Sequence, residues 1–523
     1  MTLYAIETSL IDTLGGIVGP ANVLTGTAML ALATDVYRPG AMPLAVVRPQ
    51  SVAQVQAVVA ASAAAGTAMS VRGGGASYTD GYTAADAGQL LIDMGALDAI
   101  VIDAVNGHVT VEAGVTWAAL RDALAAQDLR TPFWGPFSGM RATVGGSMSQ
   151  NTISHGSAAY GISADSVLSF DIVTADGGLL STGTAAAAAL PFMRHFGPDL
   201  TGLFTGDCGT LGIKVRITLP VLRRRPAHRP ISFAFPSFAA MHESMRLIAA
   251  ERIEDTHFAL DAALSQGQIA RQDRAGGSLA MALSIVRSSP SLPAGLRQVV
   301  QAGLTARRAI GGAKYMTHYI VEGFDDAEVK ARLHRIRAIN ASLGSEIPAT
   351  VAAVVRGMPF APFYNVLGPA GERWVPLHGN LPHSAAQGFH AALQAFLAAR
   401  AEEMREHGVW SGGMYGAIGS GGFLYEIALY WPDAITAYHE AVVPADYLAN
   451  LPRYPANPAA RAYVDQLKSD MIDLFVEHGA TNFQLGRAYP YASRLAAEPR
   501  ALIGAIKAQL DPNGLISPGN LGL

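Results

Sequence analysis

Two glycine-rich segments are the residues of this chain whose type and spacing point most directly to chemistry. They are Arg72-Gly73-Gly74-Gly75-Ala76-Ser77-Tyr78 and, further along the chain, Thr143-Val144-Gly145-Gly146-Ser147-Met148-Ser149-Gln150-Asn151. Glycine has no Cβ, so backbone N–H groups in such loops can approach a ligand closely and bind anions. One loop alone would favour an ordinary turn, because the chain has 55 glycines. The pair predicts a site for a large anionic ligand.

Three polar and aromatic clusters in the second half of the chain could act on a substrate. They lie in residues 373–383, 410–426 and 484–491, and their candidate catalytic side chains are Tyr425, Arg487, Tyr489, Glu426 and His378. An arginine beside phenols can hold a phenolate or carboxylate and lower its pKa. Each cluster also has a structural explanation: satisfied histidines in a buried strand, core tyrosines, or an arginine paired with a carboxylate. A strand from Phe423 would place Tyr425 on one face and Glu426 on the other.

Composition excludes several classes of function. The net charge is −4, only 15% of residues are charged, and the longest basic block is Arg223-Arg224-Arg225, so we expect no nucleic-acid partner. The single cysteine, Cys208, excludes an internal disulfide framework, a cysteine zinc site and a cysteinyl iron–sulfur cluster. The first forty residues lack the pattern of a signal peptide, and no apolar run is long enough to span a membrane. We expect a soluble cytoplasmic protein with no membrane partner.

The first 225 residues are predicted to form an α+β domain. Ser51 and Gln54 make a capping box before valines at helical spacing, and Thr116 caps a second helix over 117–127. Period-two patterns and turn residues predict the strands 68–71, 90–93, 99–103, 108–113, 168–174, 179–182 and 213–222. One of these strands leads directly into the first glycine loop.

A basic, proline-bearing segment, 223–230, is the predicted boundary to a second domain over 226–480. The strands expected there are 231–235, 279–286, 315–321, 350–355 and 423–430, and the longest helix expected is 384–407. This alternation predicts one sheet with helices on one side. Residues 481–523 then look like a tail that docks on the first domain.

The order of the motifs resembles a known superfamily. Arg48-Pro49, the two glycine loops, Val111 to Val115, Tyr160-Gly161 with Asp165, Gly209 to Ile213 and the terminal Pro518-Gly519-Asn520 follow one another in the chain. The set is similar to the flavoproteins named after vanillyl-alcohol oxidase and p-cresol methylhydroxylase, strongly over about residues 38–222 and the last fifteen. The resemblance implies an α+β FAD-binding fold of two subdomains, an α+β cap domain, and a C-terminal tail that returns to the FAD domain.

The resemblance also implies which residues hold FAD. The first loop would wrap the pyrophosphate, the second would line the flavin, Ile213 would approach the adenine end, and Asn520 would close over the ring. The complete predicted set is Arg72, Gly73, Gly74, Gly75, Ala76, Ser77, Tyr78, Pro136, Gly139, Thr143, Gly145, Gly146, Ser149, Gln150, Asn151, Tyr160, Gly161, Gly212, Ile213 and Asn520. Peptide dipoles would meet the two phosphate charges.

Two departures from the superfamily bear on how FAD is attached. Many members link the flavin to a histidine just after the first-loop glycines, where this chain has Ala76. Doubly linked members carry a cysteine in the second loop region, where this chain has Ser154-His155-Gly156. We therefore expect noncovalent FAD, with attachment through a cap histidine (His378, His383 or His439) as the alternative. His155 is expected to be a structural or surface residue.

A third departure bears on the substrate. The D-lactate and glycolate dehydrogenase branch has two metal-binding histidines where this chain has Ala417 and Leu424, so no metal is expected. We expect an FAD-dependent oxidoreductase that takes hydride from the carbinol or benzylic carbon of a small aromatic alcohol, phenolic or not. Oxygen or another acceptor would reoxidise the flavin, and a homodimer is possible. A metal-independent D-2-hydroxy-acid dehydrogenase and a flavin-binding protein without turnover are the alternatives.

Overall fold

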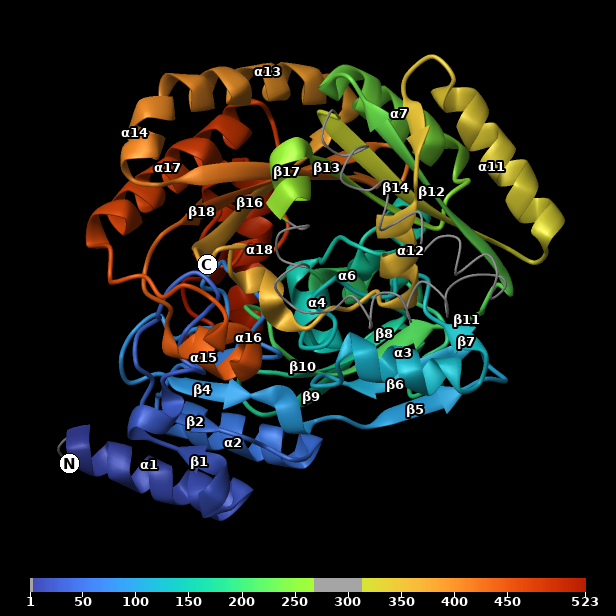
Figure 1. The fold of residues 1–523 in the computed structure, drawn as a ribbon. Coiled ribbons are helices and arrows are strands. Elements are labelled where there is room, and N and C mark those ends of the chain that lie inside the picture. The colour runs from blue at the N-terminus through green and yellow to red at the C-terminus, as the bar shows by residue number, and fades with distance from the viewer. Residues whose placement is uncertain (1–2, 268–312) are drawn as a thin grey trace.

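The computed structural model describes residues 3–267 and 313–523. The FAD-binding part expected from the sequence is built on two sheets (Figure 1). The smaller sheet has the order β1 (Val23–Leu24), β2 (Ala45–Val47), β4 (Leu90–Asp93), β3 (Met69–Arg72), and the larger has β5 (Ile100–Asp103), β6 (His108–Glu112), β10 (Ile213–Pro220), β8 (Ser169–Val173), β9 (Leu179–Ser181). The helices of this part are α1 (Leu3–Val18), α2 (Val52–Ala64), α3 (Trp117–Ala125), α4 (Val144–Gln150), α5 (Ser157–Tyr160) and α6 (Leu200–Leu203).

Local signals explain these elements. The Ser51 side chain accepts from the N–H of Gln54 at the start of α2, and Thr116 caps α3 in the same way through Ala119. The alternating residues of β6 and β10 bury Val109, Val111 and their partners in one apolar core. These features agree with the sequence-based expectation.

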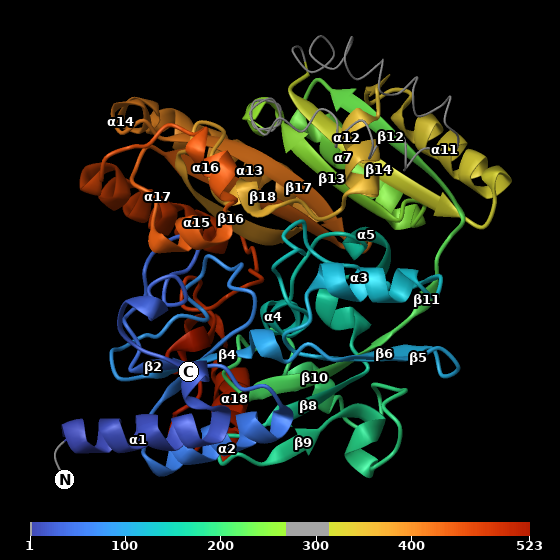
Figure 2. The same ribbon diagram turned by 60° about the horizontal axis from the view of Figure 1, so that its bottom comes forward.

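A separate sheet of seven strands lies above this part (Figures 1 and 2). Its order is β15 (Ser345–Ile347), β12 (Ala227–Phe235), β14 (Tyr315–Gly323), β13 (Thr256–Asp261), β17 (Trp410–Ile418), β18 (Gly422–Trp431), β16 (Arg373–Pro382), and all its pairings are antiparallel. We call it the cap sheet. The helices α7 (Phe238–Glu251), α11 (Asp326–Asn340), α13 (His383–Ala399), α14 (Ala401–Glu406) and α17 (Pro458–Glu477) cover its face away from the FAD-binding part (Figure 1).

Several expected elements of this region need correction. Residues 350–355 form a helix, α12 (Thr350–Gly357), because Val351 and Val355, one turn apart, pack together against the other face of the cap sheet. The expected helix 384–407 is two helices that meet at Arg400. β12 begins at Ala227, within the predicted boundary segment 223–230, whereas β11 (Leu222–Arg223) still pairs with β7 (Leu129–Arg130) of the FAD-binding part. The expected strand 279–286 lies outside the described residues.

The C-terminal residues lie among the N-terminal ones. After the short helices α15 (Ala437–Val442) and α16 (Ala445–Ala449) and the long α17, the chain leaves the cap sheet and forms α18 (Ala497–Leu510). This helix lies among elements of the FAD-binding part (Figure 2). The following residues run parallel to β3, with Met69 bonded to Leu515 and Ser517 through the backbone. The tail thus covers an edge of the smaller sheet.

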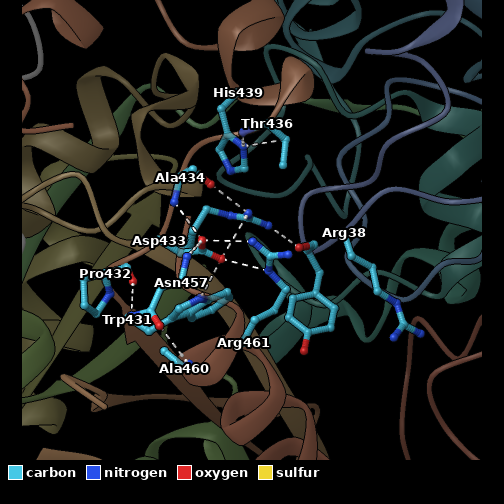
Figure 3. A network of polar contacts seen from close by, with 12 residues as sticks. Arg38, Trp431, Pro432, Asp433, Ala434, Thr436, His439, Asn457, Ala460 and Arg461 are labelled. Atoms are coloured by element: carbon cyan, nitrogen blue, oxygen red, sulfur yellow. Dashed lines mark hydrogen bonds and ion pairs between the residues drawn. The ribbon is translucent and has the colours of Figure 1, made fainter. Parts of the chain in front are cut away.

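A charged network ties the cap sheet to the FAD-binding part (Figure 3). The buried carboxylate of Asp433 accepts two bonds of 3.0 Å from the Arg461 guanidinium. Arg373, at the start of β16, donates to the backbone carbonyls of Ala434 and Tyr37. Because Tyr37 belongs to the FAD-binding part, this contact fixes one end of β16 above it.

Candidate active site

A pocket lies between the two glycine loops, and residues of both loops line it. The sequence-predicted residues that line it are Gly73, Gly74, Gly75, Ala76, Ser77, Pro136, Thr143, Gly145, Gly146, Ser149, Gln150, Gly212 and Ile213. The two loops, which the sequence separates widely, therefore share one cavity.

The first loop presents backbone donors. Within the described chain, no hydrogen bond occupies the N–H groups of residues 73–77. A Cβ on Gly74 would lie 1.7 Å from the carbonyl oxygen of Arg141, and one on Gly73 would lie 2.4 Å from the Thr143 hydroxyl. Gly75 has φ +63°, in the left-handed region. Glycine is needed here so that the first loop can pack closely against Arg141 and Thr143 at the edge of the pocket.

The second loop is the start of a helix. The Thr143 hydroxyl accepts from the N–H of Gly146 and caps α4. A Cβ on Gly145 would lie 2.7 Å from Ala113 of the neighbouring segment. Glycine therefore brings the first turn of α4 close to the residue that follows β6, and the N-terminal end of α4 lies at the pocket.

Seven of the predicted cofactor residues do not line the pocket, and each has another role. Arg72 lies beneath the first loop, bonded to the Gly73 carbonyl, and Asn151 ends α4 with φ +51°. Tyr160 accepts from Arg130, and the amide of Asn520 donates to the carbonyls of Gly81 and Cys208. The other three are Gly139 beside Phe360, Gly161 beside Asp165, and Tyr78 in the cap cluster described below.

Lys214 and Cys208 are among the pocket-lining residues that sequence reasoning missed. Lys214 follows Ile213 directly, and its ammonium bonds the Asp207 carboxylate at 2.5 Å in a buried pair. An isolated lysine at the start of an apolar strand is the signal that could have revealed it. Burial raises the pKa of the Cys208 thiol to about 12, so the side chain stays neutral.

A second cluster lies on the cap-sheet face that is turned toward the FAD-binding part. His378 of β16 and Glu426 of β18 are paired across the two strands, so their side chains share this face. Tyr489, from the segment after the cap, bonds His378 Nδ1 at 2.8 Å and also accepts from its backbone N–H. Tyr78 of the first loop lies 6.1 Å from His378, ring centre to ring centre. We call Tyr78, His378, Glu426 and Tyr489 the cap cluster.

Electrostatics distinguish Glu426 from its neighbours. Burial raises the pKa of its carboxyl to about 7, and no hydrogen bond from the described residues offsets that effect. Burial lowers the pKa of His378 to about 3, so the imidazole is neutral. Burial and the Glu426 charge raise the pKa values of the Tyr78 and Tyr489 phenols. Glu426 is thus the member of the cap cluster that can change protonation near neutral pH.

Tyr425, a candidate catalytic residue in the sequence, lies away from the cap cluster. Tyr425 is next to Glu426 in β18, and successive side chains of a strand point to opposite faces of the sheet. Its ring therefore points to the helix-covered face. There its hydroxyl bonds His390 Nδ1 at 2.8 Å, and its ring packs edge-on against Phe389, both from α13. Tyr425 is a core residue in this structure.

Arg487 is also placed differently from the expectation. Its guanidinium donates to the carbonyl and hydroxyl of Thr83, both at 3.0 Å, so it is not directed at the phenols of Tyr489 and Tyr491. The pKa of Tyr489 is raised rather than lowered. The glycine at 486, with φ +52°, turns the chain so that Arg487 and Tyr489 diverge.

The histidines considered as flavin anchors lie in three places. His378 belongs to the cap cluster, and its Nε2 has no partner among the described residues. His383 bonds His242 of α7 at 3.0 Å, and His439 bonds Thr436 beside α15. His155 is buried and stacked on Trp134, and burial lowers its pKa to about 4, as befits a structural rather than a surface residue.

Aromatic side chains flank the cap cluster. Trp374, four residues before His378 on β16, meets the Tyr78 ring edge-on at 5.6 Å. Tyr430 of β18 is paired with Trp374, and its ring is stacked on that of Trp410 of β17 with 3.9 Å between the ring centres. The face that carries Glu426 and His378 is therefore lined by apolar rings.

Three comparisons with known proteins bear on this geometry. The family model described as "FAD binding domain" matches residues 43–183, which include both glycine loops. The chain carries an FAD-binding domain. The fold of the whole chain matches p-cresol methylhydroxylase with substrate bound, with a TM-score of 0.72 and 18% identity over 100% of this chain and 98% of that one. It also matches 4-ethylphenol oxidase from Gulosibacter chungangensis, with a TM-score of 0.70 and 14% identity over 99% of this chain and 97% of that one. The FAD-binding fold that the resemblance implied is confirmed.

Curated relatives match a shorter stretch. Glycolate oxidase subunit GlcD of Escherichia coli is 29% identical over 196 residues, 37% of this chain and 38% of that protein. D-2-hydroxyglutarate dehydrogenase of Xanthomonas citri pv. viticola is 31% identical over 224 residues, 42% of this chain and 46% of that protein. The match thus spans less than half the length of these relatives.

The glycine-lined pocket fits the cofactor. Five successive backbone amides are free to bind two phosphates, and the pocket continues from Gly212 and Ile213 through both loops to Gln484 near the cap. Residues 73–77 would hold the pyrophosphate, and α4 and Gln484 would border the ring. Among the described residues, no group of three or more His, Cys, Asp or Glu side chains could hold a metal ion. No described helix is long and apolar enough to cross a membrane.

Proposed function

We propose that the chain is an FAD-dependent oxidoreductase that oxidises an uncharged aromatic alcohol or phenol, with Glu426 as the base. The observation that supports this most is the carboxyl of Glu426, partly buried and without a hydrogen-bond partner in the described chain, on the cap-sheet face turned toward the FAD-binding part. When bound, FAD supplies a two-electron acceptor that takes hydride from a carbon.

The chain's own groups would handle the proton. A carboxylate with a pKa near 7 is ionised in half the molecules at neutral pH and can accept the O–H proton of a carbinol or phenol. The neutral His378, fixed by Tyr489, presents its free Nε2 as a polar contact for the substrate. Trp374 and Tyr78 would form the flat, water-excluding walls.

Charge argues against the alternative substrate class. A 2-hydroxy acid needs a cation near its carboxylate. In the cap cluster of the described chain no arginine or lysine faces Glu426, and Arg487 bonds Thr83 instead. The names of the curated relatives nevertheless favour hydroxy acids, so these remain the second candidate.

A substrate panel separates the two. FAD-loaded protein is mixed without oxygen with benzyl alcohols, 4-alkylphenols and D-2-hydroxy acids, while the visible flavin band is followed. We expect an alcohol or phenol to bleach the band. Bleaching by hydroxy acids alone would reject the aromatic assignment, and no bleaching by any compound would favour a flavin-binding protein without turnover.

We also propose that FAD is bound without a covalent bond, because Ala76 lines the pocket where relatives have a histidine. Acid precipitation should release the flavin into the supernatant. A yellow pellet would point to attachment, and peptide mapping would then test His378 first, as it is the anchor candidate in the cap cluster.

A further inference from the structure

A row of paired residues crosses the cap sheet from Glu426. Glu426 is paired with Met414 of β17, and Met414 is paired with Leu260 of β13. Leu260 is in turn paired with Met316 of β14. Paired residues of neighbouring strands share one face of a sheet, so all four side chains lie on the face that carries the cap cluster. We call Met414, Leu260 and Met316 the apolar row.

Helix α12 covers the β12 and β14 side of this face. It contacts both strands, and it lies between the cap sheet and the FAD-binding part (Figure 1). Its residues Val351 and Val355 pack against an apolar cluster that includes Leu260, and Met414 packs against the same cluster. The two valines, Met414 and Glu426 all keep part of their surface exposed. Accessible side chains therefore extend from Glu426 to α12 along one face of the sheet.

α12 is also tied to the residues that line the FAD pocket. The N–H of Ala361, shortly after α12, donates to the carbonyl of Phe137 at 3.4 Å. The Phe137 ring packs against the same apolar cluster as the two valines, and its chain neighbours Pro136 and Ser138 line the pocket. The apolar surface that α12 shares with the cap sheet therefore reaches the edge of the FAD pocket.

The spacing of the strands gives this surface a length. Neighbouring strands lie about 4.8 Å apart, so Leu260 lies roughly 10 Å from Glu426 across the sheet. With bonds of about 1.5 Å, benzyl alcohol measures only roughly 6 Å from its oxygen to the far carbon of its ring. A substituent of about three carbons on that ring carbon would fill the difference.

We propose that the substrate is an aromatic alcohol with an apolar, uncharged substituent opposite its carbinol group, and that Val351 and Val355 limit the length of this substituent. The proposal rests on the proposed function, which places the carbinol at Glu426. The ring would then lie over Met414, and the substituent would point to α12.

The charges near α12 favour an uncharged substituent. Arg356, the charged residue of α12, bonds the Glu322 carboxylate at 2.8 Å, so its charge is already neutralised within the protein. A charged substituent would therefore be buried beside the apolar row without a partner from α12. Such burial costs free energy, whereas burial of an alkyl group is favourable.

The test is a series of substrates on the FAD-loaded full chain. Benzyl alcohol and its para-methyl, para-propyl and para-pentyl derivatives are each mixed with it without oxygen, at limiting concentration, and flavin reduction is followed. In wild type we expect the rate to rise about fourfold per added carbon up to para-propyl, the gain expected for a buried methylene group, and to fall at para-pentyl. Val355→Ala should raise the ratio of the para-pentyl rate to the para-propyl rate about tenfold. Val354→Ala makes the same change one position earlier in α12, outside the apolar cluster, and should keep the wild-type ratio.

Equal ratios in Val355→Ala and Val354→Ala at equal FAD content would overturn the proposal and leave the proposed function standing. The same holds if wild type is reduced fastest by unsubstituted benzyl alcohol, or if a para-carboxylate derivative reacts as fast as the para-methyl one. Reduction by phenols but by none of the benzyl alcohols would also overturn it alone. If no aromatic alcohol or phenol reduces the flavin, the proposed function fails, and the substituent assignment fails with it.

Discussion

The glycine loops and the cap sheet contribute to the same site in different ways. The loops act through backbone amides, and their glycines are required by contacts such as that between Gly74 and Arg141. The cap sheet acts through side chains on one face, where Glu426 lies across from His378, whereas its neighbour Tyr425 faces the helices. Cofactor binding and proton transfer should therefore be separable by mutation.

The largest expected effect is on the loops. Gly74→Ala would put a Cβ 1.7 Å from the Arg141 carbonyl, so the loops must separate and their amides can no longer converge. We expect loss of bound FAD, measured as the ratio of flavin to protein after reconstitution. Gly504→Ala in α18 is the matched control, because nothing lies within 4 Å of its Cβ; it should retain FAD. Full FAD content in Gly74→Ala would contradict the proposed cradle.

The pH dependence of reduction should follow Glu426. Its carboxyl must lose a proton to act as a base, and its pKa is raised to about 7. The rate at limiting substrate should rise about tenfold per pH unit below 7 and level off above it. The measurement is the rate of anaerobic flavin reduction from about pH 5 to about pH 9, a range that brackets this pKa. A rate that levels off near pH 4 would show that another group is the base.

The same group should affect stability. Because the folded pKa of Glu426 is above the ordinary carboxyl value, folding favours the protonated form. The protonated carboxyl contributes fully to the unfolding free energy below the ordinary carboxyl pKa. This contribution, on the order of 3 kcal/mol, is lost as the pH rises through about 7. Glu426→Gln should flatten that decline in the unfolding free energy, as measured in urea at several pH values. An unchanged slope would mean that the carboxyl is solvated.

The smallest expected effect compares two tyrosines. Tyr489→Phe removes the 2.8 Å bond to His378 Nδ1, which lets the ring reorient, and should slow reduction about tenfold. Tyr425→Phe removes a bond to His390 on the other face and should leave the rate unchanged. Equal losses in the two variants would contradict the separation of the faces.

The sequence predicted the cofactor side better than the reacting side. Glycines at 73–75 and 145–146 leave a direct signal, since the backbone geometry that they permit is the function. Alternation along β18 predicted that the side chains of Tyr425 and Glu426 point to opposite faces of the sheet. It could not predict which face is turned toward the FAD-binding part, because that depends on how the cap sheet packs over the loops. Tyr78 was expected at the pyrophosphate and instead reaches Trp374 and His378.

Long-range packing also explains two other differences between the sequence-based expectation and the structure. The β-branched residues of 350–355 favoured a strand, and packing of Val351 and Val355 against the cap sheet overrode that preference. Arg487 was grouped with Tyr489 because they are close in sequence, whereas the turn at Gly486 sends them to Thr83 and His378 respectively. Local sequence does not contain these long-range contacts.

The most direct test of the central claim is the rate of anaerobic flavin reduction by an aromatic alcohol or phenol in wild type and in Glu426→Gln at equal FAD content. We predict a loss of about 10²- to 10⁴-fold in the variant, as expected for removal of a general base. Equal rates in the two proteins would contradict the assignment of Glu426 and of the cap-sheet face that carries it.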